Sequence, residues 1–380
     1  MEAIGPMRWQ SLPPAGNTIR LDSSAESLGQ LLPGYQLVWL NSGTAALAFS
    51  LVQLKMRYPA VSQPEVIIPG YCCPDLVAAA LFAGFIPRVV DICVDDPSYD
   101  LAQLECALTQ RTLAVIAINF LGITERLTEI RQLLAPWPKV GLIEDNAQWF
   151  PDAYEVAGLQ GDYVTFSFGR GKAVSLLGGG LVAVKEGLAL FDLKLSTEAG
   201  SPSWRLKVRL LALLSQPWAY YWMEQLPFLK LGATRYHALD NICLMSAAKL
   251  LRVRANVTHY RSLSRFAEQG LKARIASTHN GLHALLTSPR CRRLLRFPLL
   301  SHRAVDRARL TENSALRGLG VSRLYNGALS ELEGIAELAL QMGPLPNAVS
   351  FARRLLTLPT HQQVKACHLA AITTLVATDK

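Results

Sequence analysis

Residues 162–172 read DYVTFSFGRGK, and residues 173–184 continue as AVSLLGGGLVAV. The alternating apolar positions predict a β-strand that ends near Ser167, and the glycines around Arg170 predict a turn that places Lys172 five residues later. The triple glycine opens a second strand. A lysine in a strand-end crevice is poorly solvated, so its ammonium group tends to lose its proton and become a nucleophile that can form a Schiff base with a carbonyl compound. The alternative is an ordinary solvated lysine in a surface turn.

Two phosphate-binding motifs are excluded by spacing. A P-loop requires a glycine five residues before Gly171 and a Ser or Thr after the lysine, whereas this chain has Phe166 and Ala173 at those places. A dinucleotide fingerprint requires a third glycine after Gly169 and Gly171, and that glycine is missing. The lysine therefore belongs to another kind of site.

A second candidate site lies upstream, where residues 140–148 read VGLIEDNAQ. This run predicts a short buried strand that ends in an acid, so Asp145 is expected at the carboxyl end of the sheet, where open α/β folds bind ligands. A carboxylate there can hold the protonated ring nitrogen of pyridoxal phosphate (PLP), which needs an anionic partner to act as an electron sink. Lys172 and Asp145 are thus expected to form one site.

Six further stretches accompany these two in a fixed order. They are NSGTAAL at 41–47, EVIIP at 65–69, GFIP at 84–87, VD at 90–91, LPNA at 345–348 and LTLPTH at 356–361. Together with EDNAQ and SFGRGK, they resemble the DegT/DnrJ/EryC1/StrS family of PLP enzymes, most of which are sugar aminotransferases. The resemblance spans most of the chain and implies a fold-type-I PLP-dependent transferase that forms a homodimer with its sites at the interface.

The resemblance also implies roles for single residues. Lys172 is expected to hold the cofactor covalently and later to move a proton at the substrate carbon, because the freed amine stays close to that carbon. Asp145 is expected to keep the ring nitrogen protonated. Gln148 is expected to lie against the ring or its hydroxyl group.

The cofactor phosphate is expected at the start of a helix predicted over residues 45–57. A helix N-terminus offers free backbone N–H groups and the positive end of a dipole to an anion. Gly43, Thr44 and Ser167 are the residues that the resemblance assigns to this phosphate. The alternative for Gly43 and Thr44 is an ordinary helix cap.

Three positions depart from the pattern of the family. Cys73 falls where an aromatic residue or a histidine usually stacks on the ring, so either Tyr71 turns toward the ring or the stacking is lost. Residues 177–180, LGGG, replace the usual Gly-Glu-Gly-Gly and lack its carboxylate. Asp240 and Asn241 occupy the nearest place to the Asn-x-Arg segment with which the partner subunit usually reaches the phosphate.

Composition limits the class of protein. The chain has 380 residues, 50% apolar and 18% charged, which indicates a folded protein of about two domains. The net charge of +9 forms no block, so it suits an anionic substrate and predicts no nucleic-acid binding. Seven scattered cysteines without paired spacing argue against a disulfide framework and a zinc site, and no metal is expected. With no apolar leader or membrane-length run, we expect a cytoplasmic protein.

Strands and helices alternate through the first part of the chain. We predict strands at 35–40, 65–69, 88–92, 113–119 and 140–144, with helices at 75–83, 101–108 and 127–134 between them. This order predicts an α/β fold with a mainly parallel sheet covered by helices on both faces, assigned to a large domain at 1–245 with an N-terminal arm at 1–23.

A smaller C-terminal α+β domain is expected at 246–380. A long helix at 245–270 is expected to lead into it, followed by a strand at 294–299 and a helix at 305–318. Closing helices are expected at 347–354, with Asn347 as N-cap, and at 365–376.

Residues 204–231 are the least typical part. Arg205, Lys207 and Arg209 alternate with apolar residues, and an aromatic run follows at 217–222. One interpretation is a basic, aromatic segment that touches a membrane; the other, which we favour from sequence, is a helix pair buried against a partner subunit.

The sequence therefore predicts a PLP-dependent aminotransferase that moves an amino group from an amino acid, with L-glutamate as the expected donor, to a nucleotide-linked keto-sugar. Such a reaction belongs to amino-sugar, surface-polysaccharide or secondary-metabolite biosynthesis. The alternatives are an enzyme of the same fold with a non-sugar or lipid-linked acceptor, and a noncatalytic regulatory relative. The few family members that act as dehydratases carry histidine at the position of Lys172.

Overall fold

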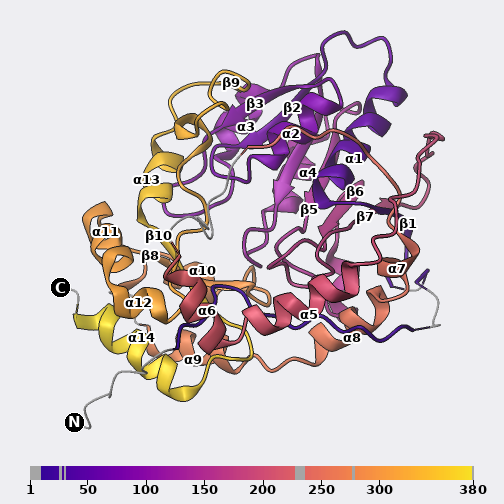
Figure 1. The fold of residues 1–380 in the computed structure, drawn as a ribbon. Helices are drawn as coiled ribbons and strands as arrows, with labels where there is room; N and C mark the ends of the chain where they lie inside the picture. The colour runs from indigo at the N-terminus through magenta and orange to yellow at the C-terminus, as the bar shows by residue number, and fades with distance from the viewer. Residues whose placement is uncertain (1–9, 25–27, 30, 227–235, 276–278, 379–380) are drawn as a thin grey trace.

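An eight-stranded sheet forms the centre of the molecule (Figure 1). The computed structural model describes residues 10–24, 28–29, 31–226, 236–275 and 279–378. The strand order is β1-β7-β6-β5-β4-β2-β3-β9. The bounds are β1 Tyr35–Leu40, β2 Glu65–Pro69, β3 Ile86–Val90, β4 Thr112–Ile118, β5 Gly141–Asp145, β6 Tyr163–Ser167, β7 Gly180–Lys185 and β9 Leu340–Gln341.

The predicted α/β fold with a mainly parallel sheet is confirmed. The pairs from β9 through β3, β2, β4 and β5 to β6 are parallel, and only β7 pairs antiparallel, with β6 on one side and β1 on the other. Parallel strands end at the same edge of a sheet, so Asp145 and Ser167, the last residues of β5 and β6, share that edge.

Helices cover both faces of this sheet, as the period of two along the strands requires. In β2, Val66 and Ile68 point into the core under α1 (Gly43–Arg57) and α2 (Asp75–Phe82), whereas Ile67 points into the core under α3 (Leu101–Ala107) and α4 (Leu127–Leu134). Every residue of β2 and β5 is buried. A short 3-10 helix, η1, spans Ala153–Gly158.

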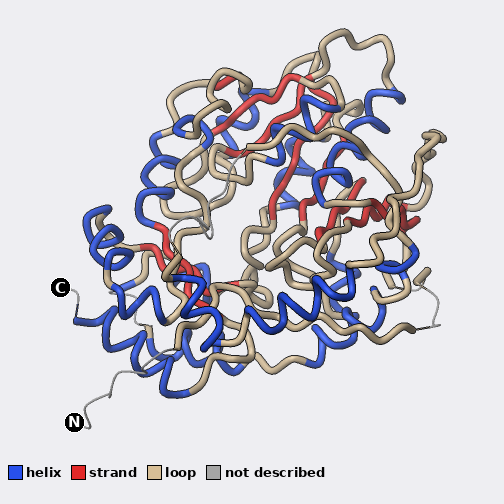
Figure 2. Tube along the Cα trace, in the orientation of Figure 1, coloured by secondary structure: helices blue, strands red, loops and turns tan. Residues whose placement is uncertain are grey.

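The C-terminal part adds mostly helices around a second, two-stranded antiparallel sheet, which Figure 2 shows apart from the main one. Its strands are β8 (Arg296–Leu300) and β10 (Leu355–Pro359). The helices are α7 Ala247–Leu250, α8 Val253–Ser262, α9 Phe266–Arg274, α10 His283–Thr287, α11 Ala304–Glu312, α12 Ser314–Gly318, η4 Leu329–Glu331, α13 Pro346–Arg354 and α14 Ala366–Thr378.

Two long helices of the sequence prediction are interrupted. The segment 245–270 forms α7, α8 and the start of α9, with Leu263 in an extended conformation and the Ser264 hydroxyl accepting a hydrogen bond from the Phe266 amide. The segment 305–318 is divided at Asn313, whose side chain caps α12. Apolar periodicity continues through both breaks, so it did not reveal them.

Asn347 is not an N-cap, which corrects another prediction. It lies inside α13, and the end of this helix is capped by Asp91, which follows β3 and is fully buried. The Asp91 carboxylate accepts hydrogen bonds from the amides of Asn347 (3.0 Å) and Ala348 (2.8 Å), while Asn347 Nδ2 donates to the Ile92 carbonyl. The C-terminal part also supplies β9 to the main sheet. The domain division at residue 245 stays a prediction.

Residues 204–224 form the predicted helix pair, α5 (Trp204–Leu214) and α6 (Pro217–Glu224), which lie end to end across the lower part of Figure 1. The remainder of the predicted segment, residues 227–231, lies outside the described residues. Within the described part of the chain, no helix combines the length and the apolar character needed to cross a bilayer.

Candidate active site

The first turn of α1 forms one side of the candidate site. Ser42 is the N-cap: its backbone is extended, and its Oγ accepts a hydrogen bond from the Ala45 amide at 3.0 Å. The cap is therefore Ser42 rather than Gly43 or Thr44. The early amides of a helix have no partner within it, so those of Gly43 and Thr44 are directed out of the helix end.

Ser167, at the end of β6, lies directly against this helix end. A Cβ added to Gly43 would lie 2.6 Å from Ser167 Cβ and 2.7 Å from its Oγ, so only glycine permits the approach. A Cβ added to Gly180, which begins β7, would overlap the Ser42 carbonyl group even more closely. These contacts bring Ser167 against the helix end formed by Gly43 and Thr44, which makes a cradle of amides and a hydroxyl group of the kind that binds phosphate. That these residues hold a phosphate stays a prediction.

Lys172 lies in the loop that returns from β6 to β7. The Leu176 and Gly178 amides both donate to the Phe168 carbonyl, and Phe168 N donates to Gly179 O, which closes the loop. Gly171 has a φ of +76°, a conformation that favours glycine. Lys172 itself is half-buried between the exposed Arg170 and the buried Ala173. These main-chain hydrogen bonds hold the loop that carries Lys172 in one conformation.

Asp145, the last residue of β5, lies close enough to Lys172 to be affected by its charge. It is 4% exposed, and its Oδ1 accepts hydrogen bonds from the Ala147 amide (2.9 Å) and from Thr165 Oγ1 (3.4 Å). Burial raises the pKa of Asp145, while the Ala147 hydrogen bond and the positive charge of Lys172 act to lower it. The Lys172 side chain is thus close enough for its charge to act on the buried carboxylate. A catalytic role for either residue stays a prediction.

Cys73 is a third residue that the charge of Lys172 affects. Burial, with a smaller effect from Asp75, raises the pKa of its thiol to about 12, and the charge of Lys172 acts in the opposite direction. The thiol is therefore protonated at neutral pH. Tyr71, the alternative candidate for ring stacking, is instead 1% exposed and packed in the core.

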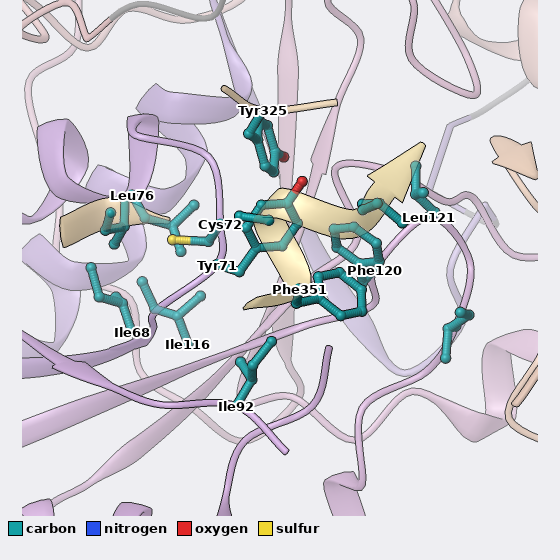
Figure 3. Close-up of a cluster of buried hydrophobic side chains, with 14 of the residues drawn as sticks. Ile68, Tyr71, Cys72, Leu76, Ile92, Ile116, Phe120, Leu121, Tyr325 and Phe351 are labelled. Carbon is teal, nitrogen blue, oxygen red and sulfur yellow. The ribbon is translucent and has the colours of Figure 1, made fainter. Parts of the chain in front are cut away.

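Figure 3 shows the cluster that holds Tyr71. Its ring centroid lies 5.7 Å from that of Phe120, 5.3 Å from Tyr325 and 5.2 Å from Phe351, in tilted or edge-on contacts. Such contacts stabilise a ring in one position beyond the burial of its surface. Cys73 is thus the residue of this segment that the charge of Lys172 reaches.

Gln148 has partners that the sequence did not indicate. Its Oε1 accepts a hydrogen bond from the Leu121 amide, and its Nε2 donates to Tyr325 Oη, each at 2.7 Å. Burial raises the pKa of Tyr325, and Cys73 and Asp145 raise it further, so this tyrosine is next to the site. Sequence reasoning missed Tyr325 because 177 residues separate it from Gln148 and no motif surrounds it. A contact of Gln148 with a cofactor stays a prediction.

An ion pair lies where the pattern of the family has a glutamate. Lys249 Nζ is 2.8 Å and 2.9 Å from the two carboxylate oxygens of Glu198, and a Cβ added to Gly178 would lie 3.0 Å from that Nζ. Nearby, Asn41 Nδ2 donates to Asn241 Oδ1 at 3.3 Å, which places Asn241 beside the start of α1 in its own chain. No pattern in the sequence indicated that Lys249 or Glu198 would lie near the site.

Part of the chain is similar in sequence to known proteins. The chain is 28% identical over 172 residues to the lipopolysaccharide biosynthesis protein RfbH of Salmonella typhimurium, covering 44% of this chain and 39% of RfbH. It is 32% identical over 169 residues to a UDP-N-acetyl-3-dehydro-alpha-D-glucosamine 3-aminotransferase of Acidithiobacillus ferrooxidans, covering 43% of each. The matched segment thus spans less than half the length of these relatives.

The fold has solved counterparts. The structure of Helicobacter pylori PseC, an aminotransferase involved in the biosynthesis of pseudoaminic acid, superposes with a TM-score of 0.70 at 14% identity, covering 97% of this chain and 99% of PseC. The sequence profile of one family matches residues 25–377, almost the whole chain. The cradle at α1, the strand-end aspartate and the loop lysine fall within that match, and the chain belongs to the DegT/DnrJ/EryC1/StrS aminotransferase family.

Proposed function

We propose that this protein is a PLP-dependent aminotransferase that transfers an amino group from an amino acid, with L-glutamate as the expected donor, to a keto-sugar carried on a nucleoside diphosphate. One observation carries the proposal: the loop that holds Lys172 brings its amine close enough to the buried carboxylate of Asp145, at the end of β5, for the charge of Lys172 to act on that carboxylate. Membership of the family and its sugar-aminotransferase relatives support the same conclusion.

The residues present fit PLP. The cradle of Gly43, Thr44 and Ser167 matches a phosphate group, because glycine at position 43 is what lets the helix end and the serine meet. Asp145, held in place by the Ala147 amide, offers an anion to a protonated ring nitrogen. Lys172 offers an amine to the aldehyde. When bound, PLP supplies the electron sink for reactions at the carbon next to the amino group.

The residues of the chain have separate tasks in this proposal. Asp145 holds a proton on the ring nitrogen by its charge, in a site from which water is largely excluded. Lys172 moves a proton to and from the reacting carbon as general acid and base. The net charge of +9 favours an anionic acceptor such as a nucleoside diphosphate sugar. A homodimer, in which a second subunit completes the site, is part of the proposal.

A single-turnover experiment tests the function. The protein loaded with PLP should convert L-glutamate into 2-oxoglutarate in an amount equal to the number of sites, and a nucleoside diphosphate keto-sugar should then receive the amino group. A noncatalytic relative would bind PLP without releasing any 2-oxo acid. Release of water from a deoxysugar precursor, without amino transfer, would instead indicate a dehydratase.

Gly43→Ala provides an independent test of the cradle. The new Cβ would meet Ser167 at 2.6 Å, so the helix end or the serine must shift. Overpacking of this kind costs about 1 to 3 kcal/mol, which corresponds to a roughly 5- to 150-fold weaker affinity for PLP if the strain falls on the phosphate site. Titration with PLP measures the loss. Gly200→Ala, where an added Cβ meets nothing within 4 Å, is the matched control and should bind normally.

A further inference from the structure

The helix pair α5–α6 carries a set of large apolar side chains that are about half exposed or more. On α5, Leu206, Leu210 and Leu213 are 66%, 50% and 49% exposed, and on α6, Trp218 and Trp222 are 54% and 56% exposed. The leucines follow one another at steps of four and three residues, and the tryptophans at a step of four, so each set forms a stripe along its helix. We name these five residues the outer stripe.

The inner face of the same pair is fully used by the fold. Trp204 and Val208 are buried, and Trp204 Nε1 donates a hydrogen bond to the Leu176 carbonyl at 2.8 Å. On α6, Ala219 is buried and the Pro217 carbonyl accepts from the Ser11 amide. The orientation of the pair is therefore fixed, and the outer stripe is not a core face that a small rotation would bury.

Basic residues of α5 border the leucines of the outer stripe on both sides. With 3.6 residues per turn, Arg205 and Arg209 lie along one flank of the leucines and Lys207 along the other, and all three are exposed. The helix pair contains one acidic residue, Glu224, which is the last residue of α6. A lipid-facing stripe of Leu and Trp with Lys and Arg at its borders is the arrangement of a helix that lies in a membrane interface, because the cations can reach anionic headgroups while the stripe enters the acyl boundary.

A second copy of the chain fits this face poorly. Two copies related by a two-fold axis contact each other through the same patch, so the three cations of one copy would face the three cations of the other. Like charges across an interface oppose association. From the sequence alone a subunit interface was preferred for this segment. The exposed positions of the leucines and of their basic flanks, which only the fold provides, favour a lipid surface instead.

We propose that α5–α6 docks the enzyme on the surface of a membrane that contains anionic phospholipids, with the outer stripe in the interface. The contact would lie next to the active site, because Leu176, which holds Trp204, belongs to the loop that carries Lys172. Docking would place that loop close to acceptors at the membrane surface. The proposal concerns association with the surface and does not depend on the reaction catalysed.

Vesicle co-sedimentation of the full-length protein tests this. Binding is expected to vesicles of phosphatidylcholine with phosphatidylserine, to be weak with phosphatidylcholine alone, and to decrease in high salt as the cations are screened. Each basic residue near an anionic surface is worth about a fivefold change in partitioning, so replacing three lowers binding by about 100-fold. The variant carries R205Q, K207Q and R209Q.

Two further variants separate charge from apolar contact. Replacing the three leucines of the outer stripe by serine should lower binding at least about tenfold without changing the net charge. A control with the same loss of charge at exposed lysines elsewhere should bind like the unmodified protein. It carries K139Q, K185Q and K194Q.

Three results would overturn the proposal. The first is no binding to anionic vesicles at low salt. The second is a loss of discrimination, either because neutral vesicles bind the protein as well as anionic ones or because the leucine variant binds as well as the unmodified protein. The third is a change from dimer to monomer in the leucine variant, measured by light scattering, together with no vesicle binding. That last result would mean that a second copy covers the stripe.

Discussion

Replacing Lys172 with alanine is expected to lower amino transfer by at least about 10³-fold, because a positioned acid/base group alone contributes about 10² to 10⁴. The variant also loses the amine that the proposal assigns to covalent attachment of PLP. The loop should keep its shape, since it is closed by main-chain hydrogen bonds of Phe168, Leu176 and Gly178. Single-turnover release of 2-oxoglutarate measures the loss, and thermal unfolding of the apo-protein should be nearly unchanged.

Two companions sharpen this test. Lys172→Arg keeps the positive charge beside Asp145 but has no nucleophilic amine, so it should be as inactive as the alanine variant if the amine matters. Lys185→Ala, at the exposed end of β7, should retain full activity. Reduction of the PLP-loaded protein with borohydride should label Lys172 in a peptide map. A label on another lysine, or substantial turnover by Lys172→Ala, would refute the site assignment.

Asp145→Asn should have the second largest effect, a loss of about 10²-fold or more in the reaction with glutamate, on the scale of removing one preorganised electrostatic group. Asparagine fills the same space and can still accept from the Ala147 amide, but it brings no negative charge to hold a proton on the ring nitrogen. The rate of the half-reaction at saturating glutamate measures the loss.

Asp75→Asn is the control for charge in general. Asp75 also raises the pKa of Asp145 and of Cys73, so it is close to the site, but it begins α2 and does not lie at a strand end. Its loss should change the rate less than about tenfold. A loss under about threefold in Asp145→Asn, well below one tenfold step in the barrier, would mean that another group holds the ring nitrogen.

Asp145→Asn should also change the pH dependence of the stability of the apo-protein, which is an independent measurement. Burial raises the folded-state pKa of Asp145, so the folded chain retains the proton of this group more strongly than the unfolded chain does. The stabilisation linked to this proton is present below the unfolded pKa and is lost as pH rises through the folded one. Asp145→Asn has no such loss. We therefore compare the melting temperatures of the two apo-proteins. The difference, Asp145→Asn minus wild type, should increase as the pH is raised from acidic to neutral.

Local patterns were enough to predict much of the fold, including the strand ends near which the candidate site lies. Residues 127–134 form a helix with the predicted bounds, and the strands around Asp145 and Ser167 lie within a residue or two of their predictions. Apolar spacing and glycine turns act over a few residues, so they can be read without knowing what lies across the sheet. The position of Asp145 and Ser167 at one edge of the sheet followed from the rule that parallel strands end at the same edge.

Contacts between distant residues lay beyond such patterns. The ring cluster around Tyr71 and the bond between Gln148 and Tyr325 join segments that no motif connects. The Lys249–Glu198 pair beside Gly178 occupies a place where the sequence suggested only a lost carboxylate. Burial supplies the reason, because a buried polar group must find a partner wherever the fold brings one.

The sequence by itself determined the alternation of strands and helices, the strand-end positions of Asp145 and Ser167, and the loop that carries Lys172. Only the tertiary structure decided that Asp91 rather than Asn347 caps α13, and that the leucines of α5 face outward between basic flanks. The physical reason is the range of the interactions. Propensity and periodicity are properties of neighbouring residues, whereas a helix cap supplied by a residue after a distant strand, and the exposed side of a helix, exist only once remote segments have packed.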